Sequence, residues 1–304
     1  MRAVLVVNPR ATATTAAGRD VLARALASQL KLDVVETDYR GHALVAAAQA
    51  REEGVDLVVA HGGDGTVNEV VNGLLQNGPG GPALGVVPGG SANVFARALG
   101  LPRDPVEATH ALLTAVTQGR SRSVGLGRVE TSEGGRWFTF NAGMGWDADV
   151  VADVDRKRGK KASPALYARV ALARYLRGER HEMSVEIPGQ ERLEGLRLVF
   201  VSNTDPWTYL GSRPVRLNPE ASFEDGLGVF ALRSLGPATV LRHVRQALSA
   251  KGVRAGRRLV HQDDVDTLLV SAKEPVKLQC DGDLIGEFDA VRFRGVAGAV
   301  TVIG

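Results

Sequence analysis

The sequence predicts an α/β N-terminal domain built on a parallel sheet, followed by a mostly antiparallel β C-terminal domain. Short apolar runs alternate with helical patterns in the first third of the chain, and glycine-rich loops follow two of these runs. The runs are continuously apolar, as expected for parallel strands that helices cover on both faces. Strand-like segments dominate the rest. We therefore expect domains at residues 1–122 and 123–304, with the last residues returning to the first domain.

In the first domain, the apolar runs predict strands at Ala3–Val7, Val34–Glu36, Asp56–Ala60 and Ala83–Val87. Helical spacing predicts helices at Ala17–Leu30, at Ala43–Glu53, from the first glycine-rich loop through about Leu75, at Ser91–Leu99 and around Val106–Thr117. Strands that alternate with helices in this way are typical of βαβ units and hence of a parallel sheet.

In the second domain, a few helices interrupt a series of predicted strands. These strands lie at Arg120–Glu130, Trp137–Ala142, Met183–Ile187, Leu196–Ser202, Gly228–Leu232, Leu259–Ser271, Pro275–Cys280 and Ala290–Arg294. Since only a few helices interrupt them, this part of the chain is expected to be mostly antiparallel.

Composition excludes several classes of protein. With 44% hydrophobic and 23% charged residues, the chain is neither disordered nor collagen-like. The net charge of +3 does not point to nucleic acid. The sequence contains one cysteine, Cys280, which favours a reducing compartment. The first apolar run stops at Asn8 and Pro9, which makes it too short for a signal peptide. We expect a cytoplasmic protein without a membrane-spanning helix.

The first glycine-rich loop, Gly62-Gly63-Asp64-Gly65-Thr66, follows a predicted strand and opens a helix. Glycines allow the backbone to approach a phosphate, and the amides at a helix start point at the anion. Asp64 would repel phosphates unless a cation lay between them, which argues for Mg²⁺. A plain βα turn is the alternative.

The second glycine-rich loop, Pro88–Asn93, follows the next predicted strand. Loops at the carboxyl ends of neighbouring parallel strands line the edge where open α/β sheets bind ligands. Asn8-Pro9-Arg10, after the first strand, is expected at the same edge. Ser91 is a candidate ligand of a phosphate, or simply the cap of the following helix.

Taken in order, these motifs resemble the diacylglycerol kinase and sphingosine kinase catalytic family, within the larger group of NAD kinases and phosphofructokinases. The resemblance spans nearly the whole chain. It rests on Asn8-Pro9, Gly62–Glu69 (GGDGTVNE), Pro88–Ala96 (PGGSANVFA), Asn141–Asp147, Asn218-Pro-Glu220, Asp225-Gly-Leu227 and Asp281-Gly-Asp283.

The resemblance implies an N-terminal nucleotide domain and a C-terminal β-sandwich, with ATP and a lipid meeting in the cleft between them. The residues that it assigns to ATP are Asn8, Pro9, Arg10, Thr37, Gly62, Gly63, Asp64, Gly65, Thr66, Val67, Asn68, Glu69 and Ser91. It assigns Mg²⁺ to Asp225 and to oxygens of Ser222 and Leu227, with Asp64 acting through the water network of the metal. Asp283 would be the general base.

Two departures from the family pattern bear on activity. Asn93-Val94 stands where many members have an Asn-Asp pair. Asp281-Gly-Asp283 replaces the usual DGE, so the base is shorter by roughly 1.5 Å of reach. Without the family, Asp281-Gly282 reads as a hairpin turn.

Other motifs carry less weight. A dinucleotide-binding pattern is formed by Gly143, Gly145 and Ala148, but no acidic residue follows at the distance needed to bind a ribose, and the sequence contains no P-loop. The histidines do not have the spacing of metal ligands, and His61 is expected to be structural. The run Arg156–Lys161 is either a solvated loop or a contact with anionic lipid headgroups at a peripheral membrane surface.

The expected function is that of an ATP- and Mg²⁺-dependent lipid kinase acting on a diacylglycerol-like hydroxyl, with phosphatidic acid or its analogue as the product. An NAD kinase is one alternative. A nucleotide-binding regulator that lost turnover is another, suggested by Val94 and Asp283. The sequence leaves open which lipid is phosphorylated and whether the protein is a homodimer.

Overall fold

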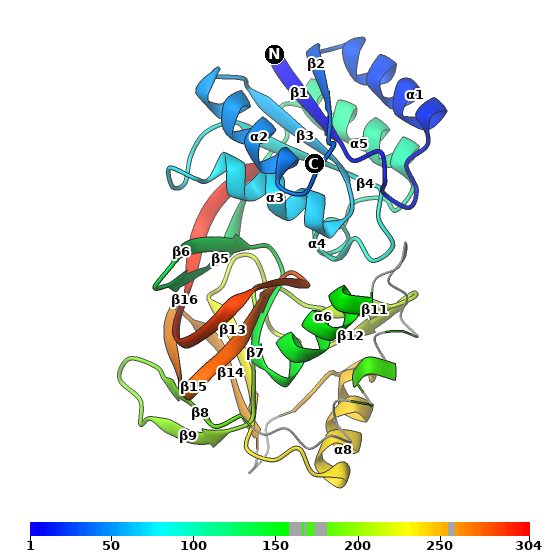
Figure 1. The fold of residues 1–304 in the computed structure, drawn as a ribbon. Coiled ribbons are helices and arrows are strands. Elements are labelled where there is room, and N and C mark those ends of the chain that lie inside the picture. Colours follow the sequence, from blue (N-terminus) through cyan, green and yellow to red (C-terminus); the bar gives the residue numbers. More distant parts are fainter. Residues whose placement is uncertain (158–165, 167–168, 172, 174–180, 255–258) are drawn as a thin grey trace. The chain divides into compact units, whose positions relative to one another are not determined.

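The computed structural model describes residues 1–157, 166, 169–171, 173, 181–254 and 259–304 (Figure 1). The chain divides into two compact units, one of residues 1–126 with 297–304 and the other of residues 127–296. Residues 158–161 of the basic run Arg156–Lys161 lie outside the described residues. Among the helices that are described, none has the length and apolar character needed to cross a membrane.

The first unit contains a parallel sheet in the order β4-β3-β1-β2. Its strands are β1 (Arg2–Val7), β2 (Lys31–Glu36), β3 (Leu57–Gly62) and β4 (Ala83–Pro88). The end of the long strand β16 (Asp283–Val302) lies parallel to β4, with Val302 opposite Leu84. The last residues thus return to this unit.

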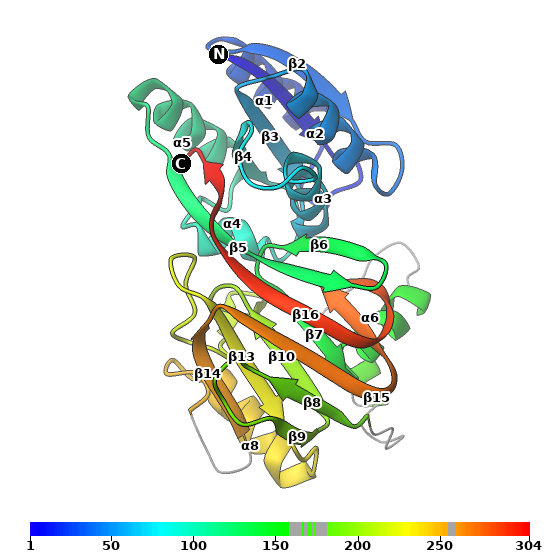
Figure 2. The ribbon, with the colours of Figure 1, turned by 90° about the vertical axis from the view of Figure 1, so that its left-hand side faces the viewer.

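Helices cover both faces of this sheet, as Figures 1 and 2 show. Helices α1 (Ala16–Ala27) and α5 (Pro105–Gln118) pack on the face that carries Leu5 of β1. Helices α2 (His42–Glu52) and α3 (Asp64–Leu74) pack together on the opposite face. The predicted α/β fold with a doubly covered parallel sheet is therefore confirmed.

Local sequence explains the ends of these helices. Helix α5 begins where the carboxylate of Asp104 accepts hydrogen bonds from the amides of Val106 and Glu107, and it ends at Gly119 in the left-handed region. Helix α4 (Val94–Ala98) is shorter than the predicted helix Ser91–Leu99.

The late start of α4 has a physical cause. Asn93 has a positive φ of 49°, and its side-chain amide bonds both the N–H and the C=O of Gly90. This ring of hydrogen bonds closes residues 90–93 into a turn, so helical geometry begins only at Val94.

The second unit is a β-sandwich whose strands pair in the order β14-β13-β10-β7-β15-β16, with antiparallel pairing along this path. The antiparallel prediction is confirmed. The strands that form it or lead into it are β5 (Arg122–Thr131), β6 (Gly134–Phe138), β7 (Asn141–Gly145), β8 (Met183–Glu186), β9 (Leu193–Leu196), β10 (Leu198–Ser202), β13 (Leu227–Leu232), β14 (Leu259–Val265), β15 (Thr267–Cys280) and β16. Strands β11 (Thr208–Leu210) and β12 (Arg213–Val215) form a separate hairpin.

Two predicted strands are in fact broken. The predicted strand Trp137–Ala142 is interrupted at Thr139 and Phe140, whose amides donate to the carboxylate of Asp281 instead of to a strand. The predicted strand Leu259–Ser271 is divided between β14 and β15. Asp264, with a positive φ of 58°, disturbs the backbone just before this division.

Alternating side chains of β10 and β13 serve two hydrophobic cores. Val199 and Val229 face the interior of the sandwich with residues of β8, β15 and β16. Phe200 and Phe230 face the other way, toward helix α8 (Pro237–Ala247), which contributes Ala247. The sheet is therefore buried on both faces at these strands.

Helix α6 (Trp146–Lys157) begins with two buried carboxyl groups in different surroundings. Asp147 is 6% exposed and accepts a hydrogen bond of 2.8 Å from Gln279. Asp149 forms ion pairs with Lys277 at 3.0 Å and with His181 at 2.7 Å. Lys277 gives Asp149 a positively charged partner that offsets its loss of hydration, whereas the hydrogen bond that Asp147 accepts from Gln279 comes from a neutral amide.

These surroundings move the two pKa values in opposite directions. Burial raises the pKa of Asp147 to about 7, against a smaller opposing effect of the hydrogen bond from Gln279. Burial also acts to raise the pKa of Asp149, but the hydrogen bonds and charges of His181 and Lys277 outweigh it and lower this pKa. Between its unfolded pKa and about 7, the folded protein holds a proton on Asp147 that the unfolded chain has lost.

We expect Asp147→Asn to gain stability relative to the parent as the pH rises from about 5 to about 8, by on the order of 3 kcal/mol. The parent loses stability over this range because the buried carboxyl must ionise, and the amide cannot ionise. Urea unfolding at each pH measures the difference.

Asp149→Asn is the matched control in the same helix turn. Its carboxylate has a lowered pKa, so its contribution is present above the unfolded pKa and is lost as the pH falls. This variant should lose stability at pH 7 and less at pH 3. A constant gap between Asp147→Asn and the parent at all pH values would mean that the pKa of Asp147 is the same in the folded and the unfolded protein.

Candidate functional site

The four parallel strands of the first unit bring the predicted loops to one edge. Val7, the last residue of β1, lies opposite Glu36 of β2 and His61 of β3, and Gly62 lies opposite Pro88 of β4. The residues that follow, among them Asn8, Thr37, Gly63 and Gly89, therefore leave the sheet at the same level. This carboxyl edge is where ligands of open α/β sheets bind.

The two glycine-rich loops pack directly on each other. The amide of Gly89 donates to the carbonyl of Gly62 at 2.7 Å. A Cβ on Gly90 would lie 2.5 Å from the Cα of Gly63, closer than any real contact. Glycine at these positions is thus required by the contact between the loops.

Gly65 is different, because a Cβ built there meets no atom within 4 Å apart from its chain neighbours and the backbone of its own helix, and its φ is not positive. Neither packing nor backbone conformation in the described structure requires a glycine at this position. Gly65 stands in the first turn of α3, whose cap Gly63 makes no side-chain hydrogen bond. The first amides of a helix have no acceptor within it, so they suit an anion.

Asn8, which follows β1, connects the loop after this strand to the first turn of α3. Its Nδ2 donates to Oγ1 of Thr66 at 3.1 Å, and its Oδ1 accepts from the amide of Arg10 at 2.9 Å. Pro9 and Arg10 are exposed. Thr37 continues from β2 and donates its amide to Val7.

The side chains of Val67, Asn68 and Glu69 make internal contacts. Val67 and Asn68 are buried. The carboxylate of Glu69 accepts hydrogen bonds from the amides of Gly41 at 2.8 Å and Ala43 at 3.2 Å, which caps the start of α2 from outside. The structure shows these three residues making contacts within the protein. Their contact with ATP stays a prediction.

Asp64 and Ser91 lie on the two loops. The Oδ1 of Asp64 accepts a long hydrogen bond of 3.3 Å from the amide of Phe95. Ser91 is exposed, and its hydroxyl is 3.2 Å from that of Thr12, a residue that sequence analysis did not identify. Because α4 begins at Val94, Ser91 does not cap this helix.

His61 connects two segments of chain beside the glycine-rich loops. Its Nδ1 lies 3.1 Å from the carbonyl of Val87, and its Nε2 lies 3.1 Å from the hydroxyl of Thr14. Burial lowers the pKa of His61, although the hydrogen bond to Val87 opposes this effect. A neutral ring that donates at Nδ1 and accepts at Nε2 satisfies both contacts.

In the second unit, Asp281 and Gly282 form the tight turn between β15 and β16, with φ values of 50° and 82°. Two consecutive positive φ values match the type I′ hairpin turn. Asp281 is buried and accepts four hydrogen bonds, from the amides of Thr139, Phe140 and Asn141 and from the Thr139 hydroxyl. It is thus a structural group.

Asp283 follows this turn at the start of β16 and is half-buried. Its Oδ2 lies 3.5 Å from Nη2 of Arg136 on β6. Gln279 also fixes the turn, since its Oε1 accepts from the amide of Gly282 at 2.9 Å and its Nε2 donates to Asn141 at 3.0 Å. Sequence analysis identified neither Arg136 nor Gln279.

The predicted metal ligands offer oxygen atoms only. The hydroxyl of Ser222 donates to Oδ2 of the exposed Asp225 at 2.6 Å. The amide of Gly226 donates to Asp264 at 2.8 Å, which fixes the backbone just before Leu227. A carboxylate, a hydroxyl and main-chain oxygens fit the preferences of Mg²⁺. No group of three or more His, Cys, Asp or Glu side chains suited to a metal occurs among the described residues.

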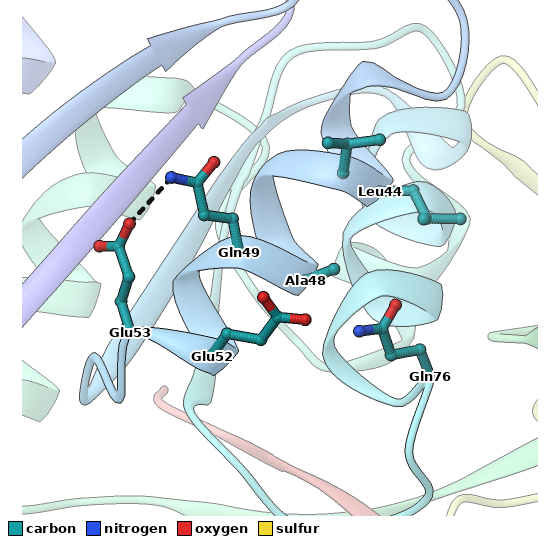
Figure 3. Close-up of a pocket in the computed structure, with 7 residues that line it drawn as sticks. Leu44, Ala48, Gln49, Glu52, Glu53 and Gln76 are labelled. Atoms are coloured by element: carbon teal, nitrogen blue, oxygen red, sulfur yellow. Dashed lines mark hydrogen bonds between the residues drawn. The ribbon is translucent and has the colours of Figure 1, made fainter.

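A pocket of about 670 Å³ lies elsewhere in the first unit, between α2 and the segment after α3 (Figure 3). Its lining includes Glu52, Glu53 and Gln49, which donates to Glu53 at 2.9 Å, and it includes no Lys or Arg. An acidic lining repels phosphate. The carboxyl edge of the sheet is therefore the better candidate for an anionic ligand.

Comparison with known proteins agrees with this geometry. Residues 2–129 match the diacylglycerol kinase catalytic domain, and residues 141–304 match the YegS C-terminal NAD kinase beta sandwich-like domain. The diacylglycerol kinase of Bacillus subtilis strain 168 is 30% identical over 94% of this chain and 92% of its own length. That of Staphylococcus aureus strain JH9 is 26% identical over 95% of this chain and 88% of its own.

Two solved structures share the fold. A diacylglycerol kinase from Bacillus anthracis strain Sterne has a TM-score of 0.73 at 22% identity, covering 99% of this chain and 96% of its own. An NAD kinase from Archaeoglobus fulgidus in complex with ATP has a TM-score of 0.55 at 13% identity, covering 100% and 94%. With both parts of its sequence matched in order, the chain belongs to the diacylglycerol kinase catalytic family, and hence among the phosphotransferases.

Proposed function

We propose that the protein transfers the γ-phosphoryl group of ATP to a hydroxyl of diacylglycerol or a related lipid, giving phosphatidic acid or its analogue. Residues 1–122 would bind the nucleotide and residues 123–304 the lipid. The observation that carries the proposal is the open position at Gly65, beside two mutually packed glycine loops at the carboxyl edge of a parallel sheet.

Binding of ATP depends on hydrogen-bond donors that the fold holds in position around the phosphates. Amides of the loop Gly62–Thr66 and of the first turn of α3 would bind the phosphates, while Asn8 holds this turn through Thr66. Such preorganised donors stabilise charge without rearrangement during the reaction. Ser91 and Thr12, whose hydroxyls lie together on neighbouring loops, would add side-chain donors.

Attack by the lipid hydroxyl requires a base that takes its proton. The lipid hydroxyl oxygen would bond to the γ-phosphorus as the bond from phosphorus to the β,γ-bridging oxygen breaks, so that ADP leaves. Asp283 would take the hydroxyl proton. Arg136 would orient the Asp283 carboxylate, and the Asp281 turn with Gln279 would fix its backbone. Asp281 has all four hydrogen bonds committed to the chain and is not the base.

Asp225, with oxygens of Ser222 and Leu227, would hold Mg²⁺, and Asp64 would act through the water shell of the cation. When bound, Mg²⁺ supplies positive charge that offsets the negative charge of the phosphates. These ligand roles are part of the proposal.

The decisive assay incubates the protein with γ-labelled ATP and, separately, with diacylglycerol, other hydroxyl lipids and NAD, followed by extraction. Label in the organic phase supports lipid kinase activity. Label on NAD would favour an NAD kinase, the activity named for one protein of the same fold. ATP binding without any labelled product would indicate a regulator.

We expect Gly65→Ala to weaken ATP binding by at least tenfold while raising thermal stability slightly. The added methyl group meets no protein atom but enters the space assigned to phosphate. Alanine is also the better helix former, by about 1 kcal/mol. Calorimetric titration with ATP and thermal unfolding give the two readings. If stability rises while ATP affinity is unchanged, the phosphates do not lie at Gly65.

We expect Asp283→Asn to lower kcat by about 10²–10⁴-fold with little change in ATP affinity, because the amide keeps the shape of the side chain but takes no proton. Asp281→Asn is the matched control. It should lose stability first, since one acceptor oxygen for its four buried donors is removed. A fully active Asp283→Asn would exclude this residue as the base.

We expect Asp225→Asn to raise the Mg²⁺ concentration needed for half-maximal activity by at least tenfold, because it removes the one charged ligand of the proposed site. Mg²⁺-induced thermal stabilisation provides a second measurement that is independent of turnover. Asp64→Asn should keep this stabilisation while losing turnover. Equal loss of stabilisation in both variants would instead make Asp64 a direct ligand.

A further inference from the structure

The segment Asn141–Asp147 resembles a motif of the family, yet the proposed function assigns none of its residues to ATP, to the metal or to the base. It contains β7 and the first residues of α6, a helix that packs against β7 and β15 (Figure 1). Its two ends, Asn141 and Asp147, are buried, and both accept a hydrogen bond from Gln279 of β15. The two ends of the segment thus meet at one buried side chain.

Gln279 is 1% exposed and uses its whole amide group. Its Nε2 donates to Oδ1 of Asn141 at 3.0 Å and to Oδ2 of Asp147 at 2.8 Å. Its Oε1 accepts from the amide of Gly282 at 2.9 Å. Rotating the amide by half a turn would place Oε1 against two oxygen atoms and Nε2 against an N–H. Because buried polar groups need partners, the two acceptors hold Gln279 in the orientation that binds Gly282.

The rest of the segment supports these contacts. Nδ2 of Asn141 donates to the carbonyl of Trp207 at 2.9 Å, which leaves Oδ1 to face Gln279. At Gly143 a Cβ would lie 2.9 Å from Oδ2 of Asp147 and 3.2 Å from Nε2 of Gln279, and the φ of this glycine is not positive. Gly143 therefore leaves the space in which the carboxyl and the amide meet.

A second contact attaches α6 to β15 beside the first. Asp149 forms an ion pair of 3.0 Å with Lys277, and Lys277 also pairs with Glu287 at 3.2 Å. Lys277 and Gln279 thus both face α6, one through a charge and the other through an amide. The ion pair is separate from the hydrogen bonds of Gln279, so it provides a control for what the amide does.

We propose that Asp147 is a positioning residue of the phosphoryl transfer, which acts through Gln279 on the turn from which Asp283 leaves. The amide of Gly282 is the last donor in this series of contacts, and Asp283 is the next residue of the chain. A Gln279 amide without its acceptor at Asp147 would rotate, release Gly282 and allow Asp283 to move. Misplacement of a reacting group by about 1 Å can cost about 10²-fold in rate.

This inference rests on the proposed function, because the position of Asp283 affects turnover only if Asp283 is the base. It deepens that function by adding a buried side chain that acts on the base from another element. Asp281 fixes the entry to the turn through residues 139–141, whereas Gln279 fixes Gly282, directly beside Asp283. The two contacts thus hold different sides of the same turn.

The acceptor oxygen of Asp147, and not its charge, is the property that matters. Burial raises the pKa of Asp147 to about 7, although the hydrogen bond from Gln279 opposes this effect. A carboxyl group presents an acceptor oxygen in its neutral and in its charged form. Asparagine keeps such an oxygen, whereas leucine keeps the branched shape without any acceptor. Asp147→Leu should therefore disturb the turn, and Asp147→Asn should preserve it.

The test measures turnover and amide exchange in the same variants of the intact protein. Asp147→Leu should lower kcat by about 10- to 10²-fold at unchanged KM for ATP, and Asp147→Asn should keep the kcat of the parent. Hydrogen exchange followed by NMR should be at least tenfold faster at the Gly282 amide of Asp147→Leu, because Oε1 of Gln279 no longer holds it. A merely structural role would lower stability without this pattern.

Variants of Gln279 test whether Asp147 acts through it. Gln279→Met removes the amide and keeps the length of the side chain, so it should reproduce the lower kcat and the faster exchange. Asp147→Leu combined with Gln279→Met should lose no more than Gln279→Met alone. Lys277→Met is the matched control, since it removes the polar end of the other β15 side chain that contacts α6. It should lose stability and keep the kcat and exchange of the parent.

The inference is overturned by parent-like kcat or parent-like exchange in Asp147→Leu, by additive losses in the double variant, or by an equal loss in Lys277→Met. It is also overturned if Asp147→Asn loses as much activity as Asp147→Leu, since charge would then be the important property. Circular dichroism and melting temperatures establish that each variant is folded, and Gln279→Met carries the test if Asp147→Leu is not.

Failure of the proposed function gives a different result. If the parent labels no acceptor, the lipid kinase proposal fails, and exchange at Gly282 decides the inference alone: faster exchange in Asp147→Leu supports it and unchanged exchange overturns it. A fully active Asp283→Asn refutes the base assignment and this inference together, but leaves the lipid kinase activity that is measured on the parent.

Discussion

The carboxylate of Asp281 is the interaction on which the geometry of the second unit depends. Its four hydrogen bonds draw three consecutive amides and a hydroxyl from residues 139–141 to one buried point. This contact ends β6, starts β7 and ties both to the turn that leads into β16. Burial raises the pKa of Asp281 and the donors counter this effect, so the group is held where a free carboxylate would be unstable.

In the first unit, glycine plays two separate physical roles. At Gly90 the absence of a side chain allows two backbones to touch, and this contact sets the spacing of the loops. At Gly65 the space beside the backbone is open, and neither a close contact nor a positive φ accounts for the glycine. A motif that looks uniform in the sequence therefore contains glycines that packing requires and one glycine that packing does not require.

The fold class could be predicted because its signals are local. Continuous apolar strands and alternating helices indicated the parallel sheet, and short strand-like segments indicated the antiparallel unit. The errors lie where a distant side chain competes with the backbone. The break at Thr139 requires Asp281, which lies far away in sequence, and the late start of α4 requires the ring between Asn93 and Gly90. Propensity contains no information on such contacts.

The candidate site was predictable to a similar extent. The loops that the strand register brings together were named from motifs, because motif residues occupy the ends of strands. Supporting groups such as Gln279 and Arg136 were missed, since their partners Gly282 and Asp283 become neighbours only through pairing of strands. The capping role of Glu69 was also missed, because its carboxylate reaches the start of α2, many residues earlier, only once α2 and α3 pack together.

The path of β16 has a consequence for how the protein is made. This strand starts beside the Asp281 turn and ends against β4, so the first unit is assembled from two stretches of chain with the entire second unit between them. During synthesis, the edge of β4 stays uncovered until that unit has emerged from the ribosome. An open strand edge is a template for wrong pairing. The nascent chain thus depends on rapid folding of its middle to protect its beginning.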